Sequence, residues 1–181
     1  MTPPLVQVVL GSTRQGRAGE RVARWFLDVA ADRDDLRLEL VDLSGPAAPC
    51  SDRSRPAAGE DDDPAQVAWA QKVAHSHALV TLEYDHGCPA VLENALDTVC
   101  AGWAGKPVAF VGYGGSAGGV RAVEQLRQVV VERDMVPLRP QVALPRAHGD
   151  DDDGALRHAR PEREAARLLD ALAHATPRDR P

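Results

Sequence analysis

Short runs of apolar residues alternate along this chain with longer segments in which apolar residues recur at helical spacing. A parallel strand needs a long crossover, usually a helix, to reach its neighbour, so this alternation is typical of a parallel sheet covered by helices. The pattern predicts strands over residues 5–10, 36–43, 78–82, 107–112 and 135–144. It predicts helices over residues 21–31, 64–75, 90–99, 120–133 and 161–175. The expected class is therefore a doubly wound α/β fold with helices on both faces of the sheet.

A chain of 181 residues is long enough for one domain with a substantial core and too short for two comfortable ones. The prediction is a single domain over residues 1–175, followed by a disordered tail at 176–181. The polar, proline-rich segment 44–63 is expected to be a surface loop. Its carboxylates at 60–63 fit a solvated helix start better than a metal site, so no metal ligands are predicted.

Charge and cysteine content exclude several classes of protein. A net charge of −6 argues against a nucleic-acid partner, because binding the phosphate backbone needs a clustered basic surface. No apolar run approaches the length needed to cross a bilayer, so no membrane association is expected. Cys50, Cys88 and Cys100 form neither an even disulfide set nor a Cys-x-x-Cys pair, and no secretory segment precedes the first strand. These features predict a cytoplasmic protein with a small-molecule substrate.

The first predicted strand runs into a glycine-rich turn, residues 11–19, that opens a helix. Glycines, hydroxyls and arginines before a helix N-terminus provide the donors that a phosphate group needs. No Gly-Lys-Ser/Thr ends the turn, and the glycines do not follow Gly-x-Gly-x-x-Gly. These absences favour a terminal monophosphate over a nucleoside triphosphate or a dinucleotide. An ordinary strand-to-helix turn with surface arginines is the alternative interpretation.

Two more turns follow predicted strands and carry groups suited to a ligand. Residues 83–89 after the third strand combine an aromatic ring, two acids, a histidine and a thiol, and residues 113–119 after the fourth are rich in glycine. In a doubly wound sheet, ligands bind outside the carboxyl ends of the strands, where the strand order reverses. The three turns are therefore expected to share one rim, with the glycines allowing the backbone to approach a flat ligand.

Three motifs occur in order along the chain, from Gly11 to Trp25, from Glu83 to Asp97 and from Gly105 to Arg127. Together they resemble the NADPH-dependent FMN reductases of flavodoxin-like fold, over residues 5–145. The resemblance implies a five-stranded parallel sheet of order 2-1-3-4-5 with FMN at the strand carboxyl ends. It also implies NADPH or NADH as hydride donor, a quinone, azo compound or free flavin as acceptor, and a homodimer or homotetramer.

Carried over by position, the resemblance also implies roles for individual residues. The residues implied to hold the FMN phosphate are Ser12, Thr13, Arg14, Arg17 and Gly19. Those implied to line the flavin ring are Leu82, Glu83, Tyr84, Asp85, Gly114, Gly115 and Ser116. Tyr84, Asp85 and His86 are the expected catalytic residues, although Tyr84 also fits a space-filling role and His86 a ring packed at the helix start.

Two positions depart from the family pattern, because Leu82 and Asp85 stand where members usually have proline and asparagine. An ionised aspartate only accepts hydrogen bonds, whereas an asparagine amide also donates them. Three interpretations of Asp85 follow. It is protonated and donates as an asparagine would, or it acts as an acid or base on a substrate, or it indicates that flavin use by this chain is altered or lost. A specialised biosynthetic enzyme and a flavin electron carrier are the alternative functions.

Overall fold

The computed structural model describes residues 2–45, 64–83, 87–99, 101–147 and 161–177. The strands are β1 (Leu5–Leu10), β2 (Arg37–Asp42), β3 (Ala78–Glu83), β4 (Pro107–Gly114) and β5 (Val136–Pro145). The helices are α1 (Ala18–Val29), α2 (Pro64–His75), α3 (Ala90–Asp97), the short η1 (Ala101–Trp103), α4 (Val120–Glu132) and α5 (Pro161–Ala175). The α/β class with parallel strands, predicted from the alternating pattern, is confirmed.

All five strands belong to one parallel sheet in the order β2-β1-β3-β4-β5. From β1 the chain moves outward to β2 and then returns across β1 to β3, after which β4 and β5 follow in sequence. The direction of winding therefore reverses between β1 and β3. Loops that leave these two strands diverge to opposite faces, and the space between them is where doubly wound sheets bind ligands.

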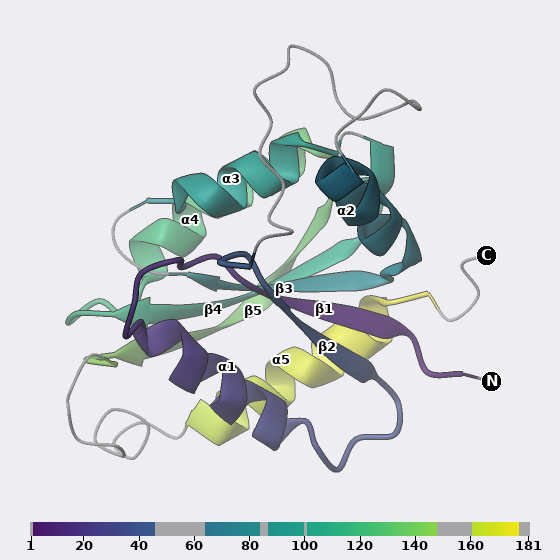
Figure 1. Cartoon of the computed structure of the whole chain (residues 1–181). Coiled ribbons are helices and arrows are strands. Elements are labelled where there is room, and N and C mark those ends of the chain that lie inside the picture. Colours follow the sequence, from purple (N-terminus) through teal and green to yellow (C-terminus); the bar gives the residue numbers. More distant parts are fainter. Residues whose placement is uncertain (1, 46–63, 84–86, 100, 148–160, 178–181) are drawn as a thin grey trace.

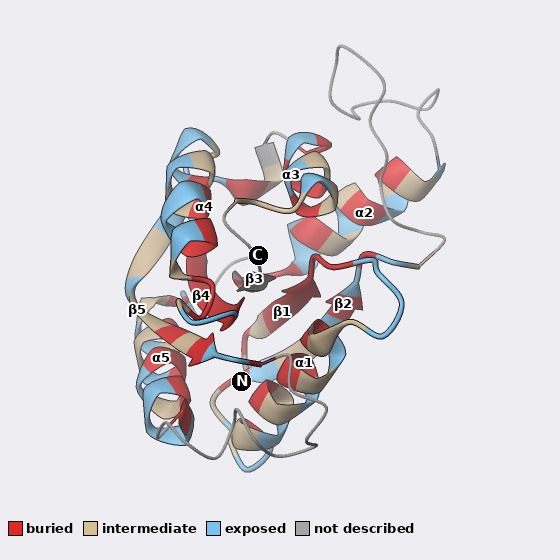
Figure 2. Cartoon of the chain, turned by 90° about the vertical axis from the view of Figure 1, so that its left-hand side faces the viewer, coloured by how far each residue is buried: buried red, intermediate tan, exposed pale blue. Residues whose placement is uncertain are grey.

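Helices cover both faces of the sheet, with α1 and α5 on one face and α2, α3 and α4 on the other (Figure 1). The core under α1 and α5 includes Val22, Phe26 and Leu169. The core under the other three helices includes Trp69, Leu92 and Leu126. Figure 2 shows buried residues along β1 and along the side of α4 that faces the sheet. Apolar burial on both faces explains why the central strands are apolar without alternation.

The helix after the glycine-rich turn begins at Ala18 rather than at residue 21, which corrects the predicted boundary. Arg17 has extended backbone angles and forms the N-cap, and Glu20 lies in the first turn. A carboxylate there is stabilised by the positive end of the helix dipole. Gly16 and Gly19 concealed this start, because glycine is a poor helix former. Gly19 consequently belongs to the helix and not to the turn.

At the other end of the chain, Thr176 continues the packing of α5. It is 4% exposed, its backbone N–H donates to the Leu172 carbonyl at 3.0 Å, and its hydroxyl donates to the same oxygen at 2.6 Å. Residue 176 was placed in the predicted tail, whereas here it closes the last turn of the helix. Residues 178–181 lie outside the described part of the chain.

Two tryptophan side chains donate hydrogen bonds to the C-terminal end of α3. The indole N–H of Trp69 donates to the Ala95 carbonyl at 2.7 Å, and that of Trp103 donates to the Leu96 carbonyl at 3.0 Å. The last four carbonyls of a helix lack partners within the helix. These indoles therefore satisfy two buried acceptors and also fill the core between α2 and α3.

Candidate functional site

The turns after β1, β3 and β4 leave the sheet from the same edge. Leu10, the last residue of β1, is paired with Leu82 of β3 on one side and with Asp42 of β2 on the other. Glu83, which ends β3, is paired with Gly112 of β4. The carboxyl ends of these parallel strands are therefore nearly level, and the turns that follow them lie close together.

A cleft of about 430 Å³ opens between the turn after β1 and the start of α3. Its described lining consists of residues 11–14 and 87–91, which contribute no carboxylate. Neither Arg17, the N-cap of α1, nor Pro89, the N-cap of α3, makes a side-chain capping hydrogen bond. The N-cap side chains therefore leave the first N–H groups of both helices without a capping acceptor of their own, and a helix N-terminus attracts anions. The cleft therefore offers a concave surface, hydrogen-bond donors and a positive electrostatic potential.

The glycines of the first turn have different roles from those that the sequence suggested. Gly16 alone among Gly11, Gly16 and Gly19 has a positive φ, 65°. A Cβ on Gly11 would lie 3.2 Å from the Cβ of Leu92, and a Cβ on Gly19 would lie 2.6 Å from the Tyr113 hydroxyl. Gly11 and Gly19 are thus sites of close packing, on α3 and on β4 respectively, and only Gly16 meets a backbone requirement.

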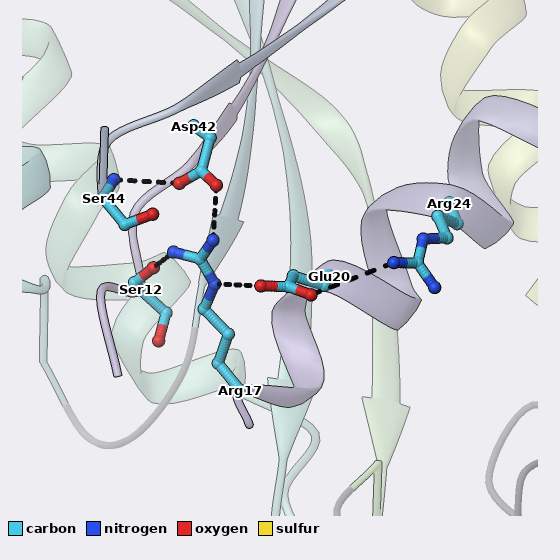
Figure 3. Close-up of polar contacts among 6 residues, drawn as sticks. All are labelled: Ser12, Arg17, Glu20, Arg24, Asp42 and Ser44. Atoms are coloured by element: carbon cyan, nitrogen blue, oxygen red, sulfur yellow. Dashed lines mark hydrogen bonds and ion pairs between the residues drawn. The ribbon is translucent and has the colours of Figure 1, made fainter. Parts of the chain in front are cut away.

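Arg17 lies beneath the turn, with its guanidinium surrounded by three acceptors (Figure 3). It donates to the backbone carbonyl of Ser12, to the carboxylate of Glu20 at 3.0 Å and to the carboxylate of Asp42. The side chain is only 6% exposed. Asp42 is held in turn by the backbone N–H of Ser44, which donates to its second carboxylate oxygen at 2.8 Å.

These contacts fix the charges of Arg17 and of the partly exposed Asp42. Burial by itself would lower the pKa of Arg17, but its hydrogen bonds to Asp42 and Glu20 outweigh burial and raise that pKa above its ordinary value. Burial by itself would raise the pKa of Asp42, whereas hydrogen bonds from Arg17 and Ser44 bring that pKa below its ordinary value. Both shifts favour the ionised forms, so the pair is a salt bridge at neutral pH.

The other expected phosphate ligands lie along the cleft. Ser12 is buried at 8% exposure, and Thr13 and Arg14 are exposed at the mouth. Gly19 is buried in the first turn of α1. The structure therefore brings Ser12, Thr13 and Arg14 together and places Arg17 behind them.

The expected flavin-ring residues are less fully described. Leu82 and Glu83 end β3, while Tyr84, Asp85 and His86 lie outside the described residues. Gly114 ends β4 with a φ of 156°, and Gly115 and Ser116 are exposed in the turn that follows. This turn is joined to the end of β5, because Arg146 and Ala147 donate backbone hydrogen bonds to the carbonyls of Gly115 and Gly114.

Two residues at the site carried no signal in the sequence analysis. Asp42 was part of a predicted strand, and its position beside Leu10 follows from sheet register alone. Gln125 of α4 accepts a hydrogen bond from the backbone N–H of Cys88 at 2.9 Å and so anchors the chain at the start of α3. A Cβ on Gly87 would lie 2.7 Å from the same amide oxygen. Both contacts join distant segments, which explains why no local pattern reveals them.

Within the described ranges, no helix has the length and apolar character required to span a membrane. The same ranges contain no cluster of three or more His, Cys, Asp or Glu side chains arranged to hold a metal ion. The acidic run at 60–63 lies outside them.

The chain is similar to several named reductases. The family model described as NADPH-dependent FMN reductase matches residues 4–149. An NAD(P)H-dependent FMN reductase of Schizosaccharomyces pombe is 33% identical over 150 residues, which cover 79% of this chain and 74% of that protein. A 2-hydroxy-1,4-benzoquinone reductase of Burkholderia sp is 32% identical over 141 residues, which cover 72% of each chain.

A solved structure shares the fold. FerB, a flavoenzyme NAD(P)H:(acceptor) oxidoreductase of Paracoccus denitrificans, matches with a TM-score of 0.68 at 17% identity and covers 95% of this chain and 97% of its own. The family match, the relatives and the flavodoxin-like α/β architecture agree with the motifs in the three turns. The chain therefore belongs to the NADPH-dependent FMN reductase family, as an oxidoreductase that uses FMN with NAD(P)H as co-substrate.

Proposed function

We propose that this enzyme passes two electrons from NADPH or NADH, by way of FMN, to a small quinone. The observation that carries the proposal is the cleft between the turn after β1 and the start of α3, at the point where the strand order reverses. When bound, FMN accepts a hydride from the nicotinamide and makes its electrons available to the acceptor. The quinone takes up two electrons and two protons and leaves as the hydroquinone.

The phosphate of FMN belongs, in this proposal, at the wall formed by residues 11–14. Ser12, Thr13 and Arg14, whose side chains carry hydroxyls and a guanidinium, line the cleft there, and the N–H groups of the first turn of α1 follow in the chain. Neutral and positive donors without a described carboxylate in the lining suit a dianion. The chemistry of the donors therefore fits a flavin monophosphate.

The isoalloxazine ring is assigned to the rim between the ends of β3 and β4. The family resemblance implies that Leu82, Glu83, Tyr84 and Asp85 lie on one side of it, and Gly114, Gly115 and Ser116 on the other. The small residues after β4 leave room for a flat ring at that edge of the sheet. Tyr84, Asp85 and His86 are proposed to contact the reacting part of the flavin and the acceptor.

The decisive experiment is a visible spectrum followed by an anaerobic titration. Purified protein reconstituted with FMN is expected to show bound oxidised flavin, to bleach on addition of NADPH, and to recover its absorbance when a benzoquinone is added. A protein that neither quenches the fluorescence of added FMN nor supports bleaching would contradict the proposal. Replacing the quinone by an azo dye or by free FMN then ranks the acceptors.

The choice of a quinone rests on the relatives, because one of them is named for reduction of 2-hydroxy-1,4-benzoquinone. Assembly into a homodimer or homotetramer and a cytoplasmic location remain predictions from the resemblance and the composition. Equilibrium sedimentation of the FMN-loaded protein measures the first of these directly.

A second function is favoured by the departures at Leu82 and Asp85. An ionised Asp85 beside the flavin would oppose the negative charge that the ring gains on reduction. In this alternative, Asp85 moves a proton on a specialised substrate and the flavin has a changed role. Asp85→Asn is then expected to tighten FMN binding and to raise NADPH oxidation, whereas unchanged binding and turnover would exclude this alternative function.

An electron carrier would instead show negligible NADPH oxidation without a separate reductase.

A further inference from the structure

Arg17 connects three separate segments of the chain at the base of the proposed phosphate site. Its Nη1 donates to the Ser12 carbonyl in the turn after β1, its Nε to Glu20 in the first turn of α1, and its Nη2 to Asp42 at the end of β2. A guanidinium has five N–H donors in a rigid plane. Each of the three guanidinium nitrogens therefore donates to a group within the protein (Figure 3).

A second hydrogen bond, from the backbone of Ser44, orients the Asp42 carboxylate toward Arg17. The Ser44 N–H donates to its Oδ1, which leaves Oδ2 directed at Arg17. Sheet register places Asp42 beside Leu10, one residue before the turn begins. The end of β2 therefore holds the Arg17 guanidinium in place through Asp42. The guanidinium in turn holds the Ser12 carbonyl by a hydrogen bond.

The charges of this cluster argue against a direct bond from Arg17 to phosphate. If the guanidinium turned toward a phosphate in the cleft, Asp42 would lose this ion pair and Glu20 would keep only the exposed Arg24, 3.9 Å away, so both carboxylates would oppose a nearby dianion more strongly. With Arg17 in place, its one positive charge is shared between the two carboxylates. The side chain is also 6% exposed, whereas a ligand for a solvent-accessible phosphate needs an open face.

We infer that Arg17 is a positioning residue, which shapes the phosphate turn through the Ser12 carbonyl and offsets part of the negative charge of Glu20 and Asp42, and that Asp42 acts on phosphate affinity through Arg17. This inference rests on the proposed FMN site. It differs from the role implied by the family resemblance, in which Arg17 is itself a phosphate ligand. The two roles give opposite signs for one substitution, Asp42→Ala.

If Arg17 binds phosphate directly, Asp42 competes for its guanidinium, and Asp42→Ala frees a cation and removes a nearby negative charge. FMN affinity would then rise. If Arg17 positions the turn, Asp42→Ala loosens it, and FMN affinity falls by about tenfold, equivalent to about 1.4 kcal/mol. Riboflavin has the same ring and no phosphate, so its affinity is expected to change by less than about twofold.

The experiment titrates FMN and riboflavin into the full-length protein and follows flavin fluorescence. The matched control is Glu39→Ala, which removes another carboxylate of β2 that is 39% exposed, as Asp42 is, and paired with Lys72 away from the turn. FMN affinity of the control is expected to stay within about twofold of the wild type. The same Asp42→Ala change in an Arg17→Met background is expected to weaken FMN binding no further, since its effect passes through Arg17.

The outcomes distinguish failure of the proposed function from failure of the positioning role of Arg17. A wild-type protein that does not bind FMN overturns the proposed function and this inference with it. A wild-type protein that binds FMN, with Asp42→Ala binding equally well or more tightly, overturns the positioning role alone. Equal losses for riboflavin and FMN, or an equal loss in Glu39→Ala, also overturn it, because the effect would then not be specific to the phosphate turn.

Discussion

The hydroxyl oxygen of Tyr113 lies so close to Gly19 that a Cβ built on the glycine would stand 2.6 Å from it. The same Cβ would stand 2.5 Å from Cδ1 of Leu10. Tyr113 is 2% exposed on β4, and Leu10 is 1% exposed at the end of β1. The first turn of α1 therefore rests directly on two strands of the sheet, and this contact sets the height of the proposed phosphate site above the sheet edge.

Gly19→Ala is expected to lower the free energy of unfolding by about 1 kcal/mol. Overpacking of a tight core costs about 1–3 kcal/mol, and the better helix propensity of alanine returns about 1 kcal/mol. Urea denaturation measures the difference. The matched control is Gly115→Ala, where an added Cβ meets nothing within 4 Å and the expected change is less than about 0.5 kcal/mol. Equal losses in the two variants would show that contact with Tyr113 is not the cause.

Trp69→Phe is expected to lower the free energy of unfolding by about 1–3 kcal/mol, because the Ala95 carbonyl at the end of α3 loses its buried donor. Trp25→Phe provides a direct comparison, since the buried Trp25 indole nitrogen has no hydrogen-bond partner among the described residues. That substitution removes an unsatisfied donor and is expected to be neutral or slightly stabilising. Thermal unfolding of both variants tests the capping role, and a larger loss in Trp25→Phe would contradict it.

Local sequence patterns predicted most of the fold because most of it is locally encoded. The apolar run at Leu5–Leu10 and the helices Pro64–His75 and Pro161–Ala175 have the same limits in the sequence analysis and in the structure. Proline at the first position marks the start of both helices, and a periodic apolar face also defines Pro161–Ala175. The other elements differ by a few residues at their ends, where capping competes with propensity.

The site was less predictable, because its contacts join segments that are far apart in sequence. The glycine-rich turn was recognised from its composition, yet the partner of Arg17 is Asp42, 25 positions along the chain. The close packing of Gly19 likewise depends on Tyr113, on another strand. A pattern of residue types shows that donors are present, but it does not show which donors are already committed within the protein.

Arg127 stabilises an irregularity in the sheet. Between Val108 and Phe110 of β4 the register shifts, so that Pro137 to Gln141 of β5 lie opposite them. Arg127 donates to the Leu138 carbonyl at 2.7 Å and to the Gln141 side-chain oxygen at 3.1 Å, with its guanidinium carbon 4.5 Å from the centre of the Phe110 ring. Extra residues in one strand leave carbonyls without ladder partners.

Arg127→Met is expected to lower the free energy of unfolding by about 2 kcal/mol, because it leaves the Leu138 carbonyl without this donor. The control is Glu124→Gln. Glu124 is 69% exposed and 3.6 Å from Nε of Arg127, and loss of such an exposed ion pair is expected to cost less than about 0.5 kcal/mol. If Glu124→Gln were as destabilising as Arg127→Met, the ion pair and not the carbonyl contact would account for the effect. Urea denaturation at moderate salt distinguishes the two, because urea is uncharged and does not itself screen the ion pair.

Asp42 is expected to make stability depend on pH in the acid range. Burial opposes its ionisation, but the hydrogen bonds from Arg17 and Ser44 prevail and set its folded-state pKa below the ordinary value. The unfolded chain, with an aspartate pKa of about 3.9, then binds protons at a higher pH than the folded protein. Ionised Asp42 therefore stabilises the fold fully above about pH 4, and this contribution is lost as the pH falls through the folded-state pKa.

Asp42→Asn removes this titration. At pH 7 the variant is expected to unfold more readily than the wild type. The difference between them is expected to shrink as the pH is lowered below about 4, because the wild-type carboxyl then becomes neutral as well. Urea denaturation of both proteins at pH 7, 5, 4 and 3 measures this difference. A gap that stayed constant from pH 7 to pH 3 would mean that the charge of Asp42 does not stabilise the fold, and that its contact with Arg17 depends on shape and hydrogen bonding alone.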